Sequence, residues 1–246
     1  MREPEFLSTQ TADEPRLDLG RLKDRAEAGR LLASRLASYR DRSDCVVVGL
    51  ARGGVPVAHE IAAALRLPLD VCIVRKLGCP FQPELAMGAL GPDGLVVWNE
   101  DLVHELGIRQ DQLEDVIRKE SGEILRREKA YRQGRPGIRL AGKTVILVDD
   151  GVATGATTLV AVQTLRRQPI ERLIVAVGVA SREAVGLLRS RADDVVCLLT
   201  PDPLMAIGSW YRDFRQVTDA EVQQLLTPRI RPDEPVRGAA AQHSRI

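Results

Sequence analysis

The segment TVILVDDGVATGATT, residues 144–158, combines residue types that suit a phosphorylated ligand. An apolar run leads to two adjacent acids, Asp149 and Asp150, and a turn rich in glycine and threonine follows them. Ligands of open α/β sheets bind at the carboxyl ends of the strands, where these carboxylates would lie. Small residues let the turn wrap a phosphate, and the N-terminus of the next helix attracts an anion.

The acids and the turn must bind different parts of such a ligand, because a carboxylate repels a phosphate. Asp149 and Asp150 would face sugar hydroxyls or a hydrated metal ion. Hydrogen bonds from N–H groups to an ionised phosphate contribute about 1.5 to 3 kcal/mol each. Several of them can hold a monophosphate without a lysine. The turn residues expected to do so are Gly151, Val152, Ala153, Thr154, Gly155, Ala156 and Thr157.

Three further segments follow apolar runs and contain candidate functional residues. Arg52, Gly53 and Gly54 come after CVVVGL, residues 45–50, while Arg75 and Lys76 end the run that begins LDVCIV at residue 69. Residues 207–214 include Trp210, Tyr211 and Phe214. Each has an ordinary alternative: the basic residues could form surface ion pairs, and the aromatic residues could pack in the core.

The segment VILVDDGVATGATT resembles the loop that binds phosphoribosyl pyrophosphate (PRPP) in the type I phosphoribosyltransferases. The resemblance implies that Asp149 and Asp150 bind the ribose 2- and 3-hydroxyls and that residues 151–157 bind the 5-phosphate. It further implies that a nitrogen nucleophile, such as a nucleobase in salvage, displaces pyrophosphate from C1. The resemblance also implies Mg²⁺, held mainly by PRPP and water near Asp149 and Asp150.

Other segments resemble further parts of that family, in the same order along residues 45–214. Ala51 to Gly54 resembles the pyrophosphate loop, in which backbone N–H groups and often a strained peptide bond meet the leaving group. Val74-Arg75-Lys76 resembles the VRK that opens a mobile catalytic loop, whose lysine contacts pyrophosphate. Residues 207–214 resemble the hood that cradles the base, with Trp210, Tyr211 and Phe214 as candidates. The implied catalytic residues are Arg52, Lys76, Asp149 and Asp150.

Ala153 departs from the 6-oxopurine branch of that family, which has an acid at this position. An acidic contact to purine N7 is therefore missing, so hypoxanthine and guanine are not the expected acceptors. Glu84 could supply acid or base function in the mobile loop. His59 and His104 have no partner arrangement nearby, and we expect both to be structural.

Alternating strand-like and helix-like runs predict an α/β fold, with a three-layer, doubly wound, mainly parallel sheet. The resemblance adds a mobile catalytic loop after residue 76 and a small C-terminal hood at about residues 200–216. We expect one domain over residues 16–227, a flexible tail at 1–15 and a disordered tail at 228–246. Strands are predicted at 45–50, 69–75, 144–150, 172–180 and 194–199, and helices at 21–40, 55–65, 109–131 and 181–190.

Two prolines and a glycine predict a loop over residues 76–84, and Gly91-Pro92-Asp93-Gly94 has the composition of a hairpin turn. The helix at 109–131 should bury only a narrow stripe, formed by Leu113, Val116, Ile117, Ile124 and Leu125. Thr218, followed by Asp-Ala-Glu, predicts the capped start of a short last helix.

Composition limits the classes of function. The chain has 35 basic and 34 acidic residues, which argues against binding to nucleic acid or to a membrane surface. Four isolated cysteines and the lack of a long apolar run favour a cytoplasmic protein. A homodimer would be an ordinary assembly.

Three functions remain open at this point. The leading one is a phosphoribosyltransferase that uses Mg-PRPP. A PRPP-sensing regulator or binding module would share the fold and the site, although the near-neutral charge and the lack of an N-terminal helix-turn-helix pattern argue against it. A hydrolase or phosphorylase that binds phosphoribose is the third.

Overall fold

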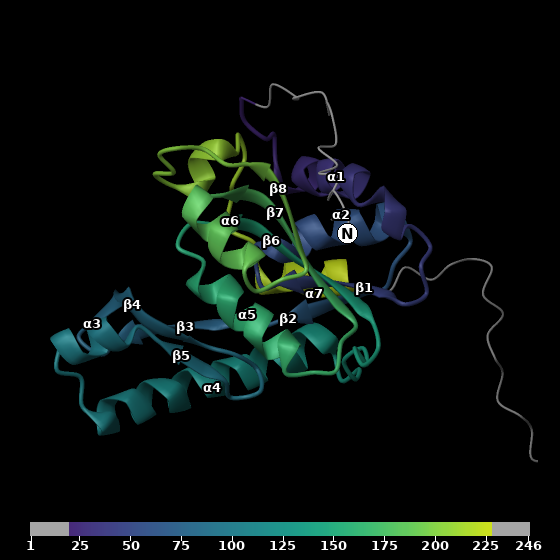
Figure 1. Cartoon of the computed structure of the whole chain (residues 1–246). Coiled ribbons are helices and arrows are strands. Elements are labelled where there is room, and N and C mark those ends of the chain that lie inside the picture. Colours follow the sequence, from purple (N-terminus) through teal and green to yellow (C-terminus); the bar gives the residue numbers. More distant parts are fainter. Residues whose placement is uncertain (1–19, 228–246) are drawn as a thin grey trace, which may run out of the picture.

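A parallel sheet of five strands forms the centre of the structure, in the order β2-β1-β6-β7-β8 (Figure 1). The structure, a computed structural model, describes residues 20–227, so the predicted tails at 1–15 and 228–246 lie outside the described residues. Every neighbouring pair in this sheet is parallel, which confirms the predicted α/β class. The strands are β1 (Cys45–Leu50), β2 (Leu69–Cys72), β6 (Thr144–Val152), β7 (Arg172–Ala180) and β8 (Asp194–Leu199).

The central strands form because their residues are apolar on both faces. All six residues of β1 are buried, and so are eight of the nine residues of β7, as in parallel sheets that helices cover on both sides. In the register of β6, Val148 lies opposite Gly49 of β1, and Asp149 lies opposite Val177 of β7. The residues after β1 and the acids of β6 therefore reach the same edge of the sheet.

Helices cover both faces of the sheet, as the doubly wound prediction requires. On one face, α1 (Arg25–Arg35) and α2 (Gly54–Leu65) pack in the same hydrophobic cluster as Ile146 and Val148 of β6. On the other face, α5 (Ala156–Arg166) and α6 (Arg182–Arg189) pack in the cluster that holds Val145 and Leu147. Successive residues of β6 thus contribute to opposite cores.

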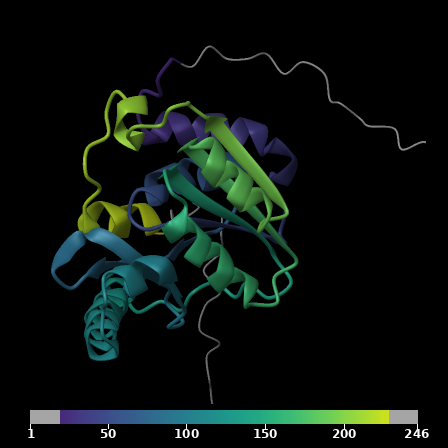
Figure 2. The same ribbon diagram turned by 60° about the vertical axis from the view of Figure 1, so that its left-hand side comes forward.

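A second, antiparallel sheet stands beside the first (Figures 1 and 2). Its strands are β3 (Arg75–Cys79), β4 (Gln82–Leu90) and β5 (Val96–Trp98), and α3 (Glu100–Glu105) and α4 (Gln110–Arg132) follow it. The predicted hairpin turn at residues 91–94 is confirmed, because β4 and β5 pair and the Gly91 N–H donates to the Leu95 carbonyl at 2.8 Å. Asn99 caps α3 by accepting the Leu102 N–H at 3.2 Å.

Two expectations about residues 69–84 were wrong. The strand predicted to run to residue 75 ends at Cys72, and the segment expected to be a loop from Lys76 to Glu84 forms most of the β3–β4 hairpin. The prolines, Pro80 and Pro83, are accommodated at the turn and near the start of β4, where few ladder hydrogen bonds are needed. Shifts of register around Gly78 adjust the pairing there.

The helix predicted at 109–131 is confirmed as α4, and Val116, Ile117 and Ile124 of its predicted narrow stripe pack in or against a core cluster. Ile124 and Tyr131 are buried, whereas Leu125, expected in the stripe, is 64% exposed. Positions 124 and 131 are seven residues apart and share one face of the helix, while position 125 is turned away from it. Within residues 20–227, no helix is long and apolar enough to cross a membrane.

The first helix is shorter than the prediction of 21–40. It begins after Asp24, whose carboxylate accepts the Glu27 N–H at 2.8 Å, and a short 3-10 helix (Ala37–Tyr39) follows it. Leu22 is not helical because it pairs with Tyr211, far along the chain. The segment before α1 is therefore fixed by the C-terminal part of the domain.

The last helix, α7 (Asp219–Leu226), packs against α2, α4 and β2. Thr218 caps it by accepting the Glu221 N–H at 3.2 Å, as the capping pattern predicted. The buried Tyr131 of α4 donates its hydroxyl to Asp219 Oδ1 at 2.6 Å. This bond joins the long helix to the first turn of α7.

Replacing Tyr131 by phenylalanine tests that connection. We expect Tyr131→Phe to lower the free energy of unfolding by about 0.5 to 1.5 kcal/mol, because one buried hydrogen bond is lost while the packing stays. Urea denaturation measures the change. The control is Tyr39→Phe, where the ring facing Arg42 is retained and a change below about 0.5 kcal/mol is expected. Equal stability of the Tyr131→Phe variant and the wild type would contradict the assignment.

Candidate functional site

A cavity of about 280 Å³ lies at the carboxyl ends of β1 and β6. All seven predicted turn residues, 151–157, line it together with Asp149. Helix α5 begins at Ala156. The residue before it, Gly155, has a φ of 85°, which is a conformation that favours glycine. The structure adds four residues to this lining: Leu50, Ala51, Thr158 and Ile207.

Strand β6 continues through the acid pair to Val152, so the strand does not end at the acids as predicted. Strand geometry sends consecutive side chains to opposite faces. Asp149 accordingly faces the α5 side, where it lines the cavity, and Asp150 faces the α1 side, where it contacts Arg25. The two carboxylates thus have different surroundings although they are adjacent in sequence.

The Asp149 carboxylate accepts hydrogen bonds from the backbone of the next residue and from the first turn of α5. Its Oδ1 accepts the Asp150 N–H at 2.9 Å, and its Oδ2 accepts the Thr158 hydroxyl at 3.1 Å. Burial, followed by repulsion from the neighbouring Asp150, raises the pKa of Asp149 well above its usual value. Burial disfavours the charged form of a carboxyl group. A cationic or hydroxyl-bearing ligand in the cavity would therefore favour its ionised form.

Asp150 is held by groups far away in the sequence. Its Oδ2 accepts a hydrogen bond from Arg25 Nε at 2.7 Å, and its backbone carbonyl accepts one from the Tyr211 hydroxyl at 2.6 Å. No motif in the sequence marks Arg25, so sequence reasoning missed it. Thr158 and Ile207 were within segments already considered, but nothing in their residue types distinguished them.

The turn after β1 packs closely against the acids. A Cβ atom on Gly53 would lie 2.1 Å from Asp150 Oδ2, and one on Gly54 would lie 2.3 Å from the Val148 carbonyl oxygen. Only glycine leaves room for this approach. The peptide bond between Ala51 and Arg52 is cis. The segment expected to bind pyrophosphate therefore lies beside the segment expected to bind the sugar.

The three predicted basic residues form ion pairs outside the cavity. Arg52 lies 3.6 Å from Asp219 of α7. On β3, Arg75 Nε donates to Glu120 at 2.7 Å, and Lys76 Nζ donates to the Glu84 carbonyl at 3.0 Å.

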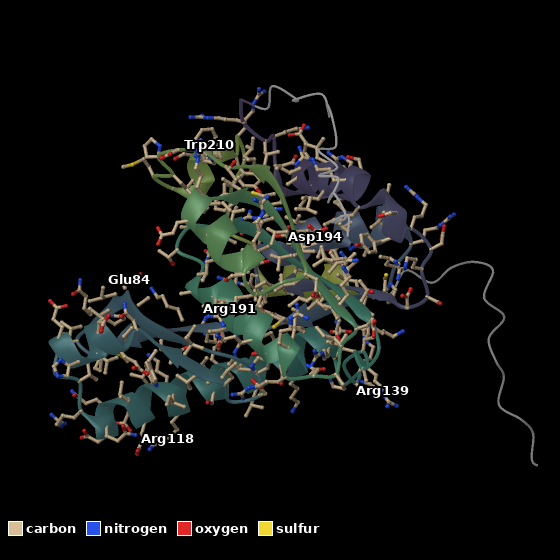
Figure 3. All side chains as sticks on the ribbon, viewed as in Figure 1. Glu84, Arg118, Arg139, Arg191, Asp194 and Trp210 are labelled. Atoms are coloured by element: carbon tan, nitrogen blue, oxygen red, sulfur yellow. The ribbon has the colours of Figure 1, made fainter. Side chains whose placement is uncertain are left out.

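Glu84 also pairs with Lys76 through its carboxylate at 3.5 Å, and its side chain is 97% exposed. Figure 3 shows it on the three-stranded sheet, apart from the hood that carries Trp210.

The hood contributes Ile207, in a 3-10 helix (Ile207–Trp210), to the cavity. Trp210, Tyr211 and Phe214 pack against the core cluster on the α1 side instead. Tyr211 is 3% exposed, and its ring stacks on Phe214 with centroids 5.0 Å apart. In this structure the aromatic residues therefore support the hood, while Ile207 faces the cavity.

Backbone hydrogen bonds fasten the hood to the segment before α1. Leu22 N–H donates to the Trp210 carbonyl at 2.9 Å, and Arg212 N–H donates to the Leu22 carbonyl at 2.8 Å. Asp213 N–H donates to the Lys23 carbonyl at 2.9 Å. The hood and the start of α1 are thus joined through their main chains.

The remaining candidates lie elsewhere. His59 Nδ1 is 3.0 Å from the Leu225 carbonyl of α7, and His104 lies on α3. Among the described residues, no group of three or more His, Cys, Asp or Glu side chains could hold a metal ion. The protein groups near the cavity that suit Mg²⁺ are the carboxylates of the acid pair.

Known proteins resemble this chain. A family model described as "Phosphoribosyl transferase domain" matches residues 93–208. Two Mycobacterium tuberculosis proteins, MT0597 (strain CDC 1551 / Oshkosh) and Rv0571c (strain ATCC 25618 / H37Rv), share the name "Putative phosphoribosyl transferase". Each is 46% identical over 203 residues, which are 82% of this chain and 46% of the relative. The chain therefore spans about half the length of these curated relatives.

A solved structure covers the chain more completely. The crystal structure of the protein TT1426 from Thermus thermophilus has 42% sequence identity and a TM-score of 0.69. The match covers 84% of this chain and 97% of that one. The fold described above is thus shared with a protein of similar extent.

The raised pKa of Asp149 predicts how stability depends on pH. The folded state binds this proton more tightly than the unfolded chain, in which the pKa of aspartate is about 3.9. The contribution of this proton to the free energy of unfolding is fully present below a pH of about 3.9, and it is lost as the pH rises through the folded-state pKa of Asp149. We expect Asp149→Asn to remove this loss, so the variant gains stability relative to the wild type as the pH rises. Urea denaturation from acidic to mildly alkaline pH measures it, and parallel curves would contradict the prediction.

Proposed function

Because this chain belongs to the phosphoribosyltransferase family, we propose that it transfers the ribose 5-phosphate group of PRPP to a nitrogen nucleophile and releases pyrophosphate. One observation carries the proposal. A single cavity gathers Asp149 with the whole turn of residues 151–157 at the start of α5. This arrangement puts a carboxylate beside phosphate-binding groups, as a phosphorylated sugar requires.

In this proposal, the turn and the first residues of α5 bind the 5-phosphate. Backbone N–H groups at a helix N-terminus attract an anion, and the hydroxyls of Thr154 and Thr157 add donors. Asp149 lines the cavity, whereas the carboxylate of Asp150 lies outside its lining and beside Gly53. In the proposal both accept hydrogen bonds from the ribose hydroxyls and orient the sugar. Their charges also favour the positive charge that develops on the ring as C1 separates from pyrophosphate.

We propose that Arg52, Arg75 and Lys76 supply positive charge to the departing pyrophosphate. Gly53 and Gly54 lie against β6 and would supply backbone N–H groups to it. The three cations are paired with Asp219, Glu120 and Glu84, and the pairs of Arg52 and Lys76 are partly exposed. Exposed pairs contribute only about 0 to 1 kcal/mol. At Arg52 and Lys76, exchange of a carboxylate for pyrophosphate would therefore cost little.

Magnesium fits the proposed site as a partner of the substrate. Carboxylate and phosphate oxygens are its usual ligands, and it commonly keeps several waters. Asp149 and Asp150 would hold it through PRPP and water. When bound, the ion would supply positive charge to the leaving oxygens.

The acceptor is proposed to be a nitrogenous base or a small amine. Ala153 and Ile207 make part of the cavity apolar, and Ala153 offers no acid at the position from which the 6-oxopurine branch contacts purine N7. We also propose that the protein is cytoplasmic, that it forms a homodimer, and that it binds neither nucleic acid nor a membrane. Cys45, Cys72 and Cys79 are buried free thiols, which is compatible with a reducing compartment.

Two variants test the donor site. We expect Thr157→Ala and Asp150→Asn each to weaken binding of Mg-PRPP about tenfold, because each removes a hydrogen-bonding group at the sugar phosphate. Isothermal titration calorimetry measures the affinity, and circular dichroism checks the fold. Thr227→Ala after α7 and Asp194→Asn at the amino end of β8 (Figure 3) are matched controls. Unchanged affinity in both site variants would refute the assignment of the loop.

Release of pyrophosphate across a panel of nucleobases and small amines tests the reaction. We expect turnover with at least one acceptor and none with hypoxanthine or guanine. Tight Mg-dependent binding of PRPP without any turnover would favour the sensing regulator instead. Release of pyrophosphate without an acceptor would favour a hydrolase. Rapid use of guanine would show that the reasoning from Ala153 is wrong.

A further inference from the structure

Arg25 connects the acid pair to the hood. It is the first residue of α1, and its Nε donates to Asp150 Oδ2 at 2.7 Å. Its Nη1 donates to the Arg215 carbonyl at 2.8 Å, and its guanidinium carbon lies 4.0 Å from the centroid of the Phe214 ring. A single side chain thus contacts the edge of β6 and two consecutive residues of the hood.

The ion pair between Arg25 and Asp150 is largely buried, since each side chain is only 12% exposed. Removing one partner of such a pair leaves the other charge without compensation in a poorly hydrated place. Arg30, five residues further along α1, differs clearly. It lies 3.6 Å from Glu60 and its side chain is 57% exposed.

The main chain of Asp150 is held from the same direction. The Tyr211 hydroxyl donates to the Asp150 carbonyl, and the Tyr211 ring stacks on Phe214. The Arg25 guanidinium lies against that same phenylalanine. Both groups that fix Asp150 therefore rest on one aromatic residue of the hood.

The Asp150 carboxylate also adjoins Gly53 of the segment proposed to bind pyrophosphate, since a Cβ atom on Gly53 would lie 2.1 Å from its Oδ2. A group that orients a reacting sugar must be held within a fraction of an ångström. We propose that Arg25 is a positioning residue that holds the Asp150 carboxylate for the sugar of PRPP and transmits the placement of the hood to it. This inference rests on the proposed function.

The contacts require an arginine in particular. A planar guanidinium can donate along two edges and stack on a ring at the same time. A lysine could supply the charge to Asp150, but not the stacking on Phe214 together with the bond to Arg215. Arg25→Lys is therefore expected to restore only part of the function.

A double-mutant cycle tests the role through Asp150. We expect Arg25→Ala to weaken binding of Mg-PRPP at least about tenfold, Arg25→Lys to weaken it less, and Arg30→Ala to leave it unchanged. In the Asp150→Asn background, Arg25→Ala should add less than about threefold, because its effect passes through that carboxylate. Isothermal titration calorimetry on the full chain provides all the affinities.

The connection between Arg25 and the hood can be measured separately, by tryptophan fluorescence. The chain contains two tryptophans, so Trp98→Phe leaves Trp210 of the hood as the only one. We expect Mg-PRPP to change the Trp210 fluorescence in this background and Arg25→Ala to abolish the change at saturating PRPP. A purely structural loss would lower the melting temperature without removing the response of the bound protein.

The outcomes separate the inference from the proposed function. Additive effects of Arg25→Ala and Asp150→Asn, or an unchanged Trp210 response, would overturn the role of Arg25 while the donor site stands. Failure of the wild type to bind Mg-PRPP would overturn the proposed function and the sugar-positioning role with it. The same cycle measured by urea denaturation then decides whether Arg25 and Asp150 are coupled at all.

Discussion

The pairing of β6 on both of its edges is the constraint on which the site depends. Parallel neighbours on each side fix its register, and the alternation of a strand then sends Asp149 and Asp150 to opposite faces of the sheet. Asp149 meets the turn and α5, while Asp150 meets α1 and the hood. The same strand therefore places one carboxylate at the cavity beside α5 and the other beside Arg25 and the hood.

A second feature of the molecule is that the charged groups of the proposed site are already paired with opposite charges. The cations proposed to meet pyrophosphate already have carboxylate partners, and Asp150 already has Arg25. The pairs differ in burial, and burial decides their energetic role. The partly exposed pairs of Arg52 and Lys76 can exchange partners at little cost, whereas the buried pair at Asp150 cannot lose a member without a large penalty. In the proposed function, the cations that can exchange partners thus bind the leaving pyrophosphate, and the carboxylate that Arg25 holds in place binds the sugar.

Much of the central sheet could be predicted because its signals are local. The runs at 45–50, 172–180 and 194–199 are continuous apolar strands, and the acids followed by glycine and threonine mark the turn. The β3–β4 hairpin could not be predicted in the same way, since its prolines suggested a loop and its pairing depends on neighbouring strands. Arg25 shows the same limit for the site, because it meets Asp150 across 125 positions of sequence, and no local pattern encodes that distance.

The hydrogen bonds between residues 22–23 and the hood have a consequence for how such a protein can diversify. These bonds join backbone groups, which are the same for nearly every residue type, so they hold the segment in place whatever side chains it carries. Ile207 can therefore be exchanged during evolution without releasing its support. In the proposed function, a lineage could acquire a new acceptor by substitution at Ile207 while it keeps the residues proposed to bind PRPP, and a protein engineer could exploit the same division.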